Sequence, residues 1–413
     1  MRTAQVIRRL NFSEWGGTET VVWNSARELA RRDCDVEILA TSALGGAALE
    51  SIDGLTIRRF KYFYPYFPLS AARKLALDKK GGNPFCFGME RRLKSGGYEL
   101  IHCHNLGRLA ELSARAAEKC GVPLVLSLHG GCADVPEAER MELVRPLRHT
   151  VPYGGVVERL LRLRRDPLLA ASGIVCVGAN EVAALTKRYP DKLVRHIPNG
   201  VDVEKFRRPA AEFDWRRKLG ISQTATLLLN VSRIDYQKNQ KQLVRLTAEL
   251  TRRGEDVHLL LIGPVSAGWY GRELERLAVE LGVRGRVTLA GGMRPDDGRL
   301  VAAYQQADVF ILPSQHEPFG IVVLEAWSAG LPVIASRVGG LGMLVADGET
   351  GLQFDSGDDA GLLACCAALP AKRNELIANA ARLVKEKYSW SAVGGQLAAF
   401  YREVSDAGNI VCK

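Results

Sequence analysis

The stretch that most restricts the fold of this chain is residues 307–336. Within it, 309–312 is an apolar run closed by a proline, which predicts a short buried strand. A polar turn follows at 314–320, and a helix is expected over 321–330, where a glycine fits a left-handed cap. A second proline prevents the helix from continuing, and the apolar residues 333–335 predict the next strand. Strand, loop, helix and strand in this order indicate one unit of a parallel α/β sheet.

Two carboxylates lie in this unit: Glu317 in the loop and Glu325 five residues into the helix. Between them, unpaired N–H groups at the helix start are expected to favour an anion, and they belong to Phe319, Gly320, Ile321 and Val322. The layout suits a ligand with a central diphosphate and a sugar at each end, with one carboxylate for each sugar. The alternative is that both acids merely favour the helix dipole. Their joint occurrence with Pro-Phe-Gly and two flanking strands favours the ligand site.

The sequence E-P-F-G-I-V-V-L-E-A-x-x-x-G-x-P-V-I-A resembles the E-x7-E signature of retaining glycosyltransferases, most of all glycosyltransferase family 4. This resemblance covers nearly the whole chain. It implies an α/β GT-B fold, in which two Rossmann-like, doubly wound parallel-sheet domains face each other across a cleft. In that family Glu317 holds the donor sugar and Glu325 the ribose.

The resemblance extends to other donor-binding positions in the second half. Arg233 and Lys238 follow an apolar strand at 226–231 and match an R-x4-K motif whose cations clamp the donor diphosphate. Backbone groups near Met293 match those that hold the nucleobase. At Gly263 the chain departs from the G-x-G of many relatives, which leaves the base-side contacts there open.

In the first half, the family pattern assigns roles to residues near three predicted strand ends. Gly17, in a glycine turn that opens a helix, matches a position that approaches the donor phosphate. His129 matches a histidine beside the donor sugar, and we include it with Glu317 and the two cations as a catalytic candidate. Glu19 and Asp134 are the acceptor-binding candidates.

Metal chemistry is the alternative for the histidines. His102 and His104 lie on one face of a predicted strand, and together with His129 and Cys132 they could ligate zinc. The spacing of a complete ligand set is missing, and the family uses this H-x-H to shape the cleft. The D-x-D at 33–35 lies where relatives make no donor contact. We therefore expect no metal and no cofactor, because the two cations and the helix dipole offset the diphosphate charge.

The domain boundary is expected near residue 200, where I-P-N-G-V-D forms a turn. Residues 1–200 would form the acceptor-binding domain and 201–388 the nucleotide-sugar-binding domain. The last helix, within 389–413, would pack back on the first domain. The charge is divided unevenly, since residues 1–200 carry 30 Lys and Arg against 21 Asp and Glu, and the remainder 26 against 25. This excess indicates an anionic partner for the first half.

Two stretches suggest where that partner would bind. Residues 58–94 are basic and aromatic, and 137–166 place arginines among apolar residues in predicted helices with a basic face. These features fit an anionic membrane surface or, alternatively, a packed surface loop with solvated charges. The chain lacks a signal-peptide pattern and an apolar run of 18 residues, and its nine cysteines are scattered. We expect a cytoplasmic protein, with attachment at the inner face of the cell membrane as an added hypothesis.

Together these observations predict a hexosyltransferase that moves a sugar from a nucleotide-diphosphate sugar to a hydroxyl of a glycan, lipid-linked or small-molecule acceptor. Such a reaction belongs to polysaccharide or glycoconjugate biosynthesis and involves no nucleic acid. Two rivals remain. One is a nucleotide-sugar epimerase of the same fold, which needs no acceptor. The other is a basic protein that binds nucleic acid or membrane, with a steep salt dependence.

Overall fold

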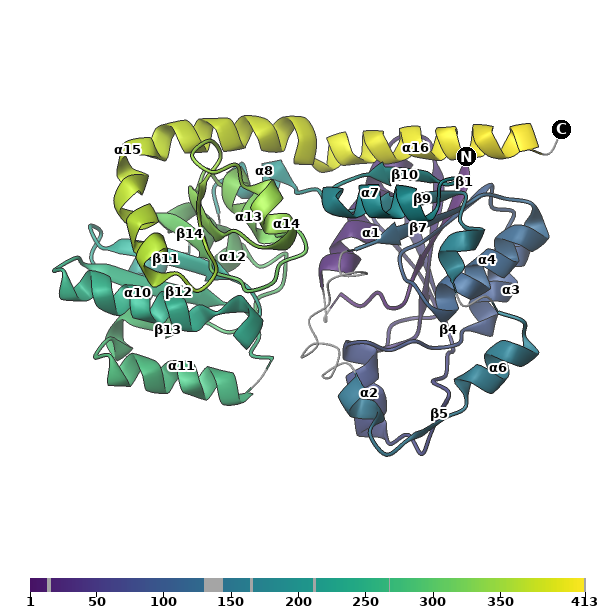
Figure 1. Cartoon of the computed structure of the whole chain (residues 1–413), viewed down its shortest axis with the longest axis horizontal. Coiled ribbons are helices and arrows are strands. Elements are labelled where there is room, and N and C mark those ends of the chain that lie inside the picture. The colour runs from purple at the N-terminus through teal and green to yellow at the C-terminus, as the bar shows by residue number, and fades with distance from the viewer. Residues whose placement is uncertain (13–15, 130–143, 164–165, 211–212, 267, 412–413) are drawn as a thin grey trace. The chain divides into compact units, whose positions relative to one another are not determined.

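The computed structural model describes residues 1–12, 16–129, 144–163, 166–210, 213–266 and 268–411, and every structural statement below concerns these residues. They form two compact units (Figure 1). Unit 1 is Met1–Pro198 with Val393–Lys413, and unit 2 is Asn199–Ala392. Each unit is a parallel sheet covered by helices, and the two are described separately.

Unit 1 is built on a described sheet with the strand order β10-β9-β7-β6-β1-β2-β4-β3, parallel except for β3. A short antiparallel ribbon, β5-β8, lies outside it. The elements are β1 (Arg2–Ile7), α1 (Gly17–Ala30), β2 (Asp35–Thr41), β3 (Leu49–Ile52), β4 (Leu55–Phe60), β5 (Tyr66–Phe67), α2 (Ala71–Lys79), α3 (Phe87–Ser95), β6 (Leu100–Cys103), α4 (Arg108–Cys120), β7 (Leu124–Leu128), η1 (Arg145–Leu147), β8 (Val151–Pro152), α6 (Gly154–Leu160), η2 (Pro167–Ala170), β9 (Gly173–Cys176), α7 (Ala179–Arg188), β10 (Leu193–His196) and most of α16 (Trp390–Val411).

The central strands of unit 1 are apolar because helices cover both faces of the sheet. Val6, Leu126 and Ile174, on three of these strands, are fully buried in one core with residues of α4. Each such side chain contributes about 1.5–3 kcal/mol when it leaves water. Helix α4 ends at Gly121, whose φ of +67° forms the left-handed cap. The core therefore fixes the strand ends from which the functional loops project.

Unit 2 has a described sheet in the order β13-β12-β11-β14-β15-β16, and every pair in it is parallel. The elements are α8 (Val203–Arg207), α9 (Trp215–Leu219), β11 (Thr226–Val231), η3 (Tyr236–Lys238), α10 (Gln240–Arg252), β12 (Val257–Ile262), α11 (Gly268–Glu280), η4 (Arg284–Arg286), β13 (Val287–Leu289), α12 (Gly298–Gln306), β14 (Val309–Leu312), α13 (Ile321–Ser328), β15 (Val333–Ser336), α14 (Gly339–Leu344), β16 (Leu352–Phe354), α15 (Asp359–Leu383) and the π-helical turn η5 (Val384–Tyr388).

The predicted unit at 307–336 is confirmed as β14, α13 and β15, with Gly330 at a φ of +76° just beyond the helix. The last helix, α16, is divided between the two units. Its first turn clusters with unit 2, because the Trp390 N–H donates to the Val201 carbonyl at 3.2 Å and the indole ring packs on Gly200. From Val393 onward the helix belongs to unit 1. Of the expected helices within 137–166, the described part, 144–163, contains α6 and the short η1, with β8 between them, while 137–143 and 164–165 lie outside the described residues.

Candidate active site

Unit 2 has one topological switch point, between β11 and β14. From β11 the chain builds β12 and β13 on one side, and it then returns to build β14, β15 and β16 on the other. The loops that follow β11 and β14 therefore diverge at the carboxyl edge of the sheet, and open α/β sheets bind their ligands there. Arg233 and Lys238 belong to the first loop and Glu317 to the second.

The structure joins these two loops directly. The Lys238 Nζ lies 2.7 Å from the Glu317 Oε2, and both side chains are largely shielded, at 12% and 14% exposed. The Gln315 N–H also donates to the Gln237 carbonyl at 2.7 Å. Two residues that are 79 positions apart in sequence thus form one ion pair at the switch point. Either member can change partner when an anion or a sugar hydroxyl arrives.

Arg233 has a weaker attachment. Its Nη1 lies 3.1 Å from Asp235, and its side chain is 40% exposed. Asp235 is buried and also accepts the Gln237 N–H at 2.9 Å, which fixes the carboxylate. The guanidinium is therefore anchored at one side and accessible at the other, an arrangement suited to a phosphate.

The backbone between Glu317 and α13 is held by a second loop. Gly320 has a φ of +94° and precedes the helix, and no side chain caps the helix start. The Gly340 N–H donates to the Glu317 carbonyl at 3.1 Å. A Cβ on Gly340 would lie 1.9 Å from the Pro318 carbonyl oxygen, so only glycine fits. The backbone at the start of α13 is therefore held in place, and its N–H groups have no side-chain cap. That they bind an anion stays a prediction.

Glu325 lies inside the unit, in the middle of α13. The Tyr304 hydroxyl donates to its Oε2 at 2.7 Å. Burial raises the pKa of Glu325, while the Lys205 ammonium and the Tyr304 hydroxyl lower it. Since one carboxylate oxygen is occupied by Tyr304, the other is the acceptor left for a ligand hydroxyl.

Met293 is half-buried in the loop after β13. The neighbouring backbone is tightly packed, because the Gly263 N–H donates to the Gly291 carbonyl at 2.9 Å. A Cβ on Gly263 would lie 1.8 Å from the Ser232 carbonyl oxygen. The loops after β11, β12 and β13 are therefore in contact. The loop that departs from the G-x-G of many relatives is thus closely packed against its neighbours.

Unit 1 has its own switch point, between β1 and β6. The Arg8 N–H, just after β1, donates to the Asn105 Oδ1 just after β6 at 2.5 Å. Gly17 is the first residue of α1. Glu19 is buried in the first turn of that helix, and its Oε1 lies 2.7 Å from the Arg9 Nε. Because the two side chains are paired, an acceptor bound at Glu19 would also meet Arg9. The sequence did not indicate Arg9.

Three histidines of unit 1, His102, His104 and His129, form a buried group. The His102 Nδ1 lies 2.5 Å from the Tyr401 hydroxyl and its Nε2 lies 2.7 Å from the Ser127 hydroxyl. The His104 Nε2 lies 2.8 Å from the Gln5 Oε1, and its Nδ1 lies 3.1 Å from the His129 Nε2. Burial lowers the pKa of His102 to about 3 and that of His129 to about 4, so all three rings are neutral at pH 7.

This chain of contacts assigns the proton positions. The Gln5 Oε1 can only accept, so the His104 Nε2 carries hydrogen and the His104 Nδ1 accepts from the His129 Nε2–H. The His129 Nδ1 is then a bare acceptor, and it is buried without a partner among the described residues. An unpaired acceptor of this kind is costly, which indicates a place for a ligand donor.

Several contacts were not predicted from sequence. Tyr304 and Lys205 act on Glu325 from α12 and α8, and Gly340 fixes the Glu317 loop from α14. The V-G-G at 338–340 was the only signal for any of these. Asp134 lies outside the described residues.

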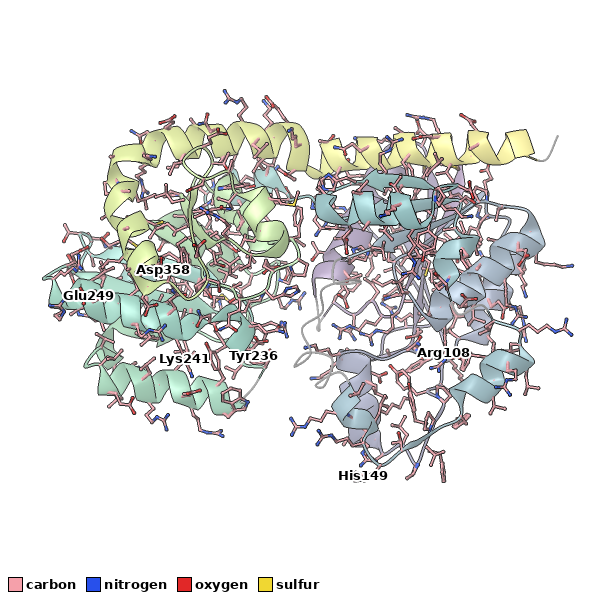
Figure 2. All side chains as sticks on the ribbon, viewed as in Figure 1. Arg108, His149, Tyr236, Lys241, Glu249 and Asp358 are labelled. Carbon is pink, nitrogen blue, oxygen red and sulfur yellow. The ribbon has the colours of Figure 1, made fainter. Side chains whose placement is uncertain are left out.

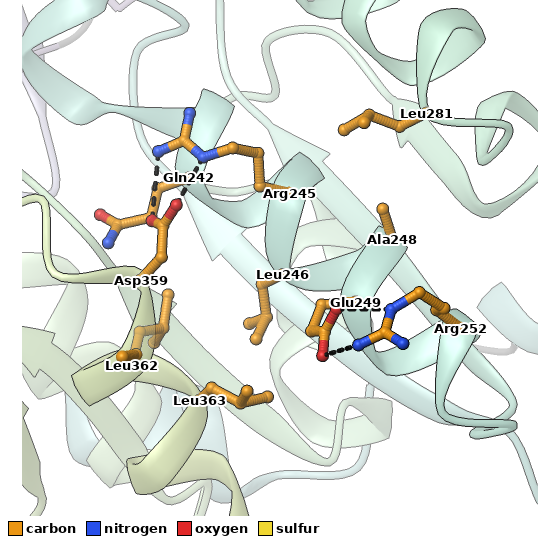
Figure 3. A pocket seen from close by; sticks show the side chains of 11 residues that line it. Gln242, Arg245, Leu246, Ala248, Glu249, Arg252, Leu281, Asp359, Leu362 and Leu363 are labelled. Carbon is orange, nitrogen blue, oxygen red and sulfur yellow. Dashed lines mark hydrogen bonds and ion pairs between the residues drawn. The ribbon is translucent and has the colours of Figure 1, made fainter.

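Other possible sites are limited. Among the described residues, no group of three or more His, Cys, Asp and Glu is arranged to hold a metal ion. No described helix has the length and apolar character needed to cross a membrane. A cavity of about 570 Å³ lies between α10 and α15, with the ion pairs Arg245–Asp359 and Arg252–Glu249 at its ends (Figure 3). It shares no residue with the two switch-point loops of unit 2.

Solved structures with the same architecture identify the fold. The HepE protein of Anabaena with bound UDP and glucose matches at a TM-score of 0.69, with 21% identity over 98% of this chain and 100% of that one. Sucrose-phosphate synthase of Thermosynechococcus elongatus matches at 0.69, with 23% identity over 98% and 99%. With its two doubly wound units, this chain thus has the GT-B fold, as the sequence predicts.

Sequence comparisons identify the protein family. The model for Glycosyltransferase Family 4 matches residues 15–205, and that for Glycosyl transferases group 1 matches 211–388. D-inositol 3-phosphate glycosyltransferase of Saccharomonospora viridis is 32% identical over 95% of this chain and 90% of its own. The protein of that name from Rhodococcus jostii is 31% identical over 94% and 84%. The chain belongs to glycosyltransferase family 4 and is a hexosyltransferase.

Proposed function

We propose that this enzyme transfers a hexosyl group from a uridine-diphosphate sugar to a hydroxyl of a phosphorylated polyol or sugar, with retention of configuration. Unit 2 binds the donor and unit 1 binds the acceptor. The observation that carries the proposal is the Lys238–Glu317 ion pair at the switch point of unit 2. The uridine is supported by the UDP in the HepE structures, and retention by the family.

Donor binding would replace ion pairs that exist in the enzyme without ligand. The diphosphate of the donor takes Lys238 from Glu317, and Arg233 extends its exposed side toward the same anion. The uncapped N–H groups at the start of α13 add a positive partial charge equivalent to about half an elementary charge. Glu317, released from Lys238, is then free to accept hydroxyls of the sugar. The free oxygen of Glu325 accepts a ribose hydroxyl.

The chemistry follows from this arrangement. The bond between the anomeric carbon and the phosphate oxygen breaks, and a bond to the acceptor oxygen forms on the same face. The acceptor proton passes to the leaving phosphate, so no side chain acts as a nucleophile. Lys238, Arg233 and the helix start stabilise the charge that develops on the phosphate. The bare Nδ1 of His129 accepts a hydrogen bond from a hydroxyl of the donor sugar, and this bond orients the sugar ring.

The acceptor is proposed on two grounds. Relatives that align with nearly the whole chain are named D-inositol 3-phosphate glycosyltransferases. In addition, residues 1–200 carry nine more Lys and Arg than Asp and Glu, which favours an anionic acceptor. Arg9, in the first loop of the unit 1 switch point, has a buried Nη1 without a partner among the described residues. This nitrogen is our candidate donor to the acceptor phosphate.

The proposal is tested with the purified enzyme. UDP-, GDP- and ADP-sugars are compared for thermal stabilisation, and the donor that stabilises most is incubated with D-inositol 3-phosphate. The anomeric configuration of the product is read by NMR. We expect transfer with retention, undiminished by excess EDTA and abolished by Arg233→Ala or Lys238→Ala. Arg276→Ala, a surface arginine paired with Glu280, is the matched control and should be silent.

Other outcomes are informative. Epimerised or hydrolysed donor without an acceptor would favour the epimerase alternative. Loss of activity in EDTA with recovery in magnesium or manganese would refute the charge argument for Arg233 and Lys238. Stabilisation by a UDP-sugar with transfer to unphosphorylated acceptors alone would keep the donor assignment and overturn the acceptor.

A further inference from the structure

Unit 1 carries a separate surface feature, which we call the small lobe: residues 66–80 and 145–163. It comprises β5, α2, η1, β8 and α6. The lobe is one piece, because β5 pairs with β8, helix α2 contacts η1, and the Tyr153 N–H donates to the Pro65 carbonyl at 3.0 Å. Within unit 1 it lies at the end away from α16 (Figure 1). None of the catalytic candidates belongs to it.

The small lobe exposes large apolar side chains in pairs. Phe67 and Val151 face each other across the ribbon and are 71% and 67% exposed. Val156 and Leu160 are four residues apart on α6 and are 63% and 78% exposed. Residues four apart lie on the same helical face, so each element presents an apolar edge to solvent. Exposed apolar groups gathered in one region mark an interaction surface.

The same lobe is rich in cations. The lobe has eight Lys and Arg and only two acids, so it holds most of the positive excess of the first half. Neither acid is free: Glu158 lies 2.8 Å from the Arg108 Nε, and Asp78 accepts hydroxyls from Tyr62 and Tyr64 at 2.7 and 2.9 Å. Arg108 and His149 mark this region in Figure 2.

Several arginines of the small lobe form no ion pair with a described residue. Within the described part of the chain, no ion pair involves any of four exposed arginines, which are Arg145, Arg148, Arg159 and Arg162. Two of them, Arg159 and Arg162, line a hollow of about 560 Å³ together with Pro152 and Val156. Apolar side chains and free guanidinium groups are thus combined at one surface.

The two stretches that the sequence indicated contribute unequally to this surface. In 58–94, Tyr64 and Phe85 are buried and the Tyr62 hydroxyl is bonded to Asp78. Of that stretch, Phe67 is the most exposed aromatic described. The exposed apolar side chains come mainly from 151–160, which lies within the other stretch, 137–166.

We propose that the small lobe docks on the surface of an anionic lipid bilayer. Its apolar side chains enter the interface between headgroups and acyl chains, while the free arginines contact the lipid phosphates. A bilayer fits better than a folded protein partner, because the apolar groups come from two separate short elements of a lobe with an excess of cations. The attachment is peripheral and weakens as salt screens the charges.

The test is co-sedimentation of the full chain with vesicles. Vesicles of equimolar phosphatidylglycerol and phosphatidylcholine should bind the protein at low salt and release it at high salt, and pure phosphatidylcholine vesicles should not bind it. Arg145→Gln/Arg159→Gln/Arg162→Gln should weaken binding by about fivefold for each charge removed. Val156→Ser/Leu160→Ser should weaken binding without changing its salt dependence.

The control removes the same number of charges elsewhere. Arg253→Gln/Arg272→Gln/Arg276→Gln alters exposed arginines of unit 2 and should bind vesicles as the wild type does. Equal losses in both triple variants would show that overall charge, not the small lobe, is responsible, and would overturn the proposal. So would equal binding to neutral vesicles, or none to either. Thermal unfolding of each variant confirms that it is folded.

Discussion

The variant Glu325→Gln should weaken UDP binding and, by a separate effect, stabilise the enzyme without ligand. The Tyr304 hydroxyl occupies one carboxylate oxygen at 2.7 Å, which leaves one oxygen for a ribose hydroxyl. Glutamine keeps an oxygen for Tyr304 and nearly the same volume, but it removes the charge. One hydrogen bond to a charged group contributes about 1.5–3 kcal/mol, so the Kd for UDP should rise about 10- to 150-fold.

The same variant should be more stable without ligand. Burial raises the pKa of Glu325 above its ordinary value of 4.5, so the carboxylate disfavours folding once it is ionised. The stabilising contribution of the protonated form is complete below pH 4.5 and is lost as pH rises through the raised pKa. Glutamine does not ionise, so its advantage in free energy of unfolding should be largest at neutral pH and should shrink as pH falls toward 4.5.

Calorimetry with UDP and urea unfolding at several pH values measure the two effects. Glu317→Gln is the matched control, because it removes the carboxylate that pairs with Lys238. Its affinity for UDP should be unchanged or slightly higher, since Lys238 is freed for the phosphate, whereas sugar transfer should fall. Equal losses of UDP affinity in both variants would refute the assignment of ribose to Glu325 and sugar to Glu317.

Two further predictions concern the supporting structure. Gly340→Ala should lower the free energy of unfolding by about 2–4 kcal/mol, because its Cβ would overlap the Pro318 carbonyl oxygen. Gly285→Ala is the control and should be nearly neutral, because there is open space around Gly285. Urea unfolding of both variants measures the difference. Burial holds the pKa of His102 and His129 below the ordinary 6.5, so the stability they contribute is present above pH 6.5 and is lost as pH falls toward about 4. Urea unfolding from pH 7 to 4 should show this decline, and a flat profile would contradict it.

The sheet was predictable where its strands are buried on both faces. β11, β12 and β14 are mostly apolar runs, so their sequence alone distinguishes them from the loops. Strand β3 was missed, since it lies at the edge of the sheet and its residues are exposed or half-buried. Helix α15 is continuous from Asp359 to Leu383 although Pro370 lies inside it, and a proline in the sequence would suggest a helix boundary there. The helix bends in Figure 1, as a proline within a helix requires.

The candidate site was predictable only in part. The family pattern identified Lys238 and Glu317, but no local pattern indicates that they pair, because the ion pair depends on the order of strands in the sheet. Contacts from distant helices, such as that of Tyr304 with Glu325, leave no periodic signal either. Their roles toward a donor remain predictions.

The division of the chain into units has a consequence for its synthesis. Unit 1 is discontinuous: its last segment, Val393–Lys413, is separated from Pro198 by the whole of unit 2. That segment supplies Tyr401, whose hydroxyl completes the bonds of His102 and Gln5 in the core of unit 1. On the ribosome, unit 2 emerges as one uninterrupted stretch and can complete its core first. The half of the enzyme that is translated first is therefore the half that finishes folding last, once the final helix has left the exit tunnel.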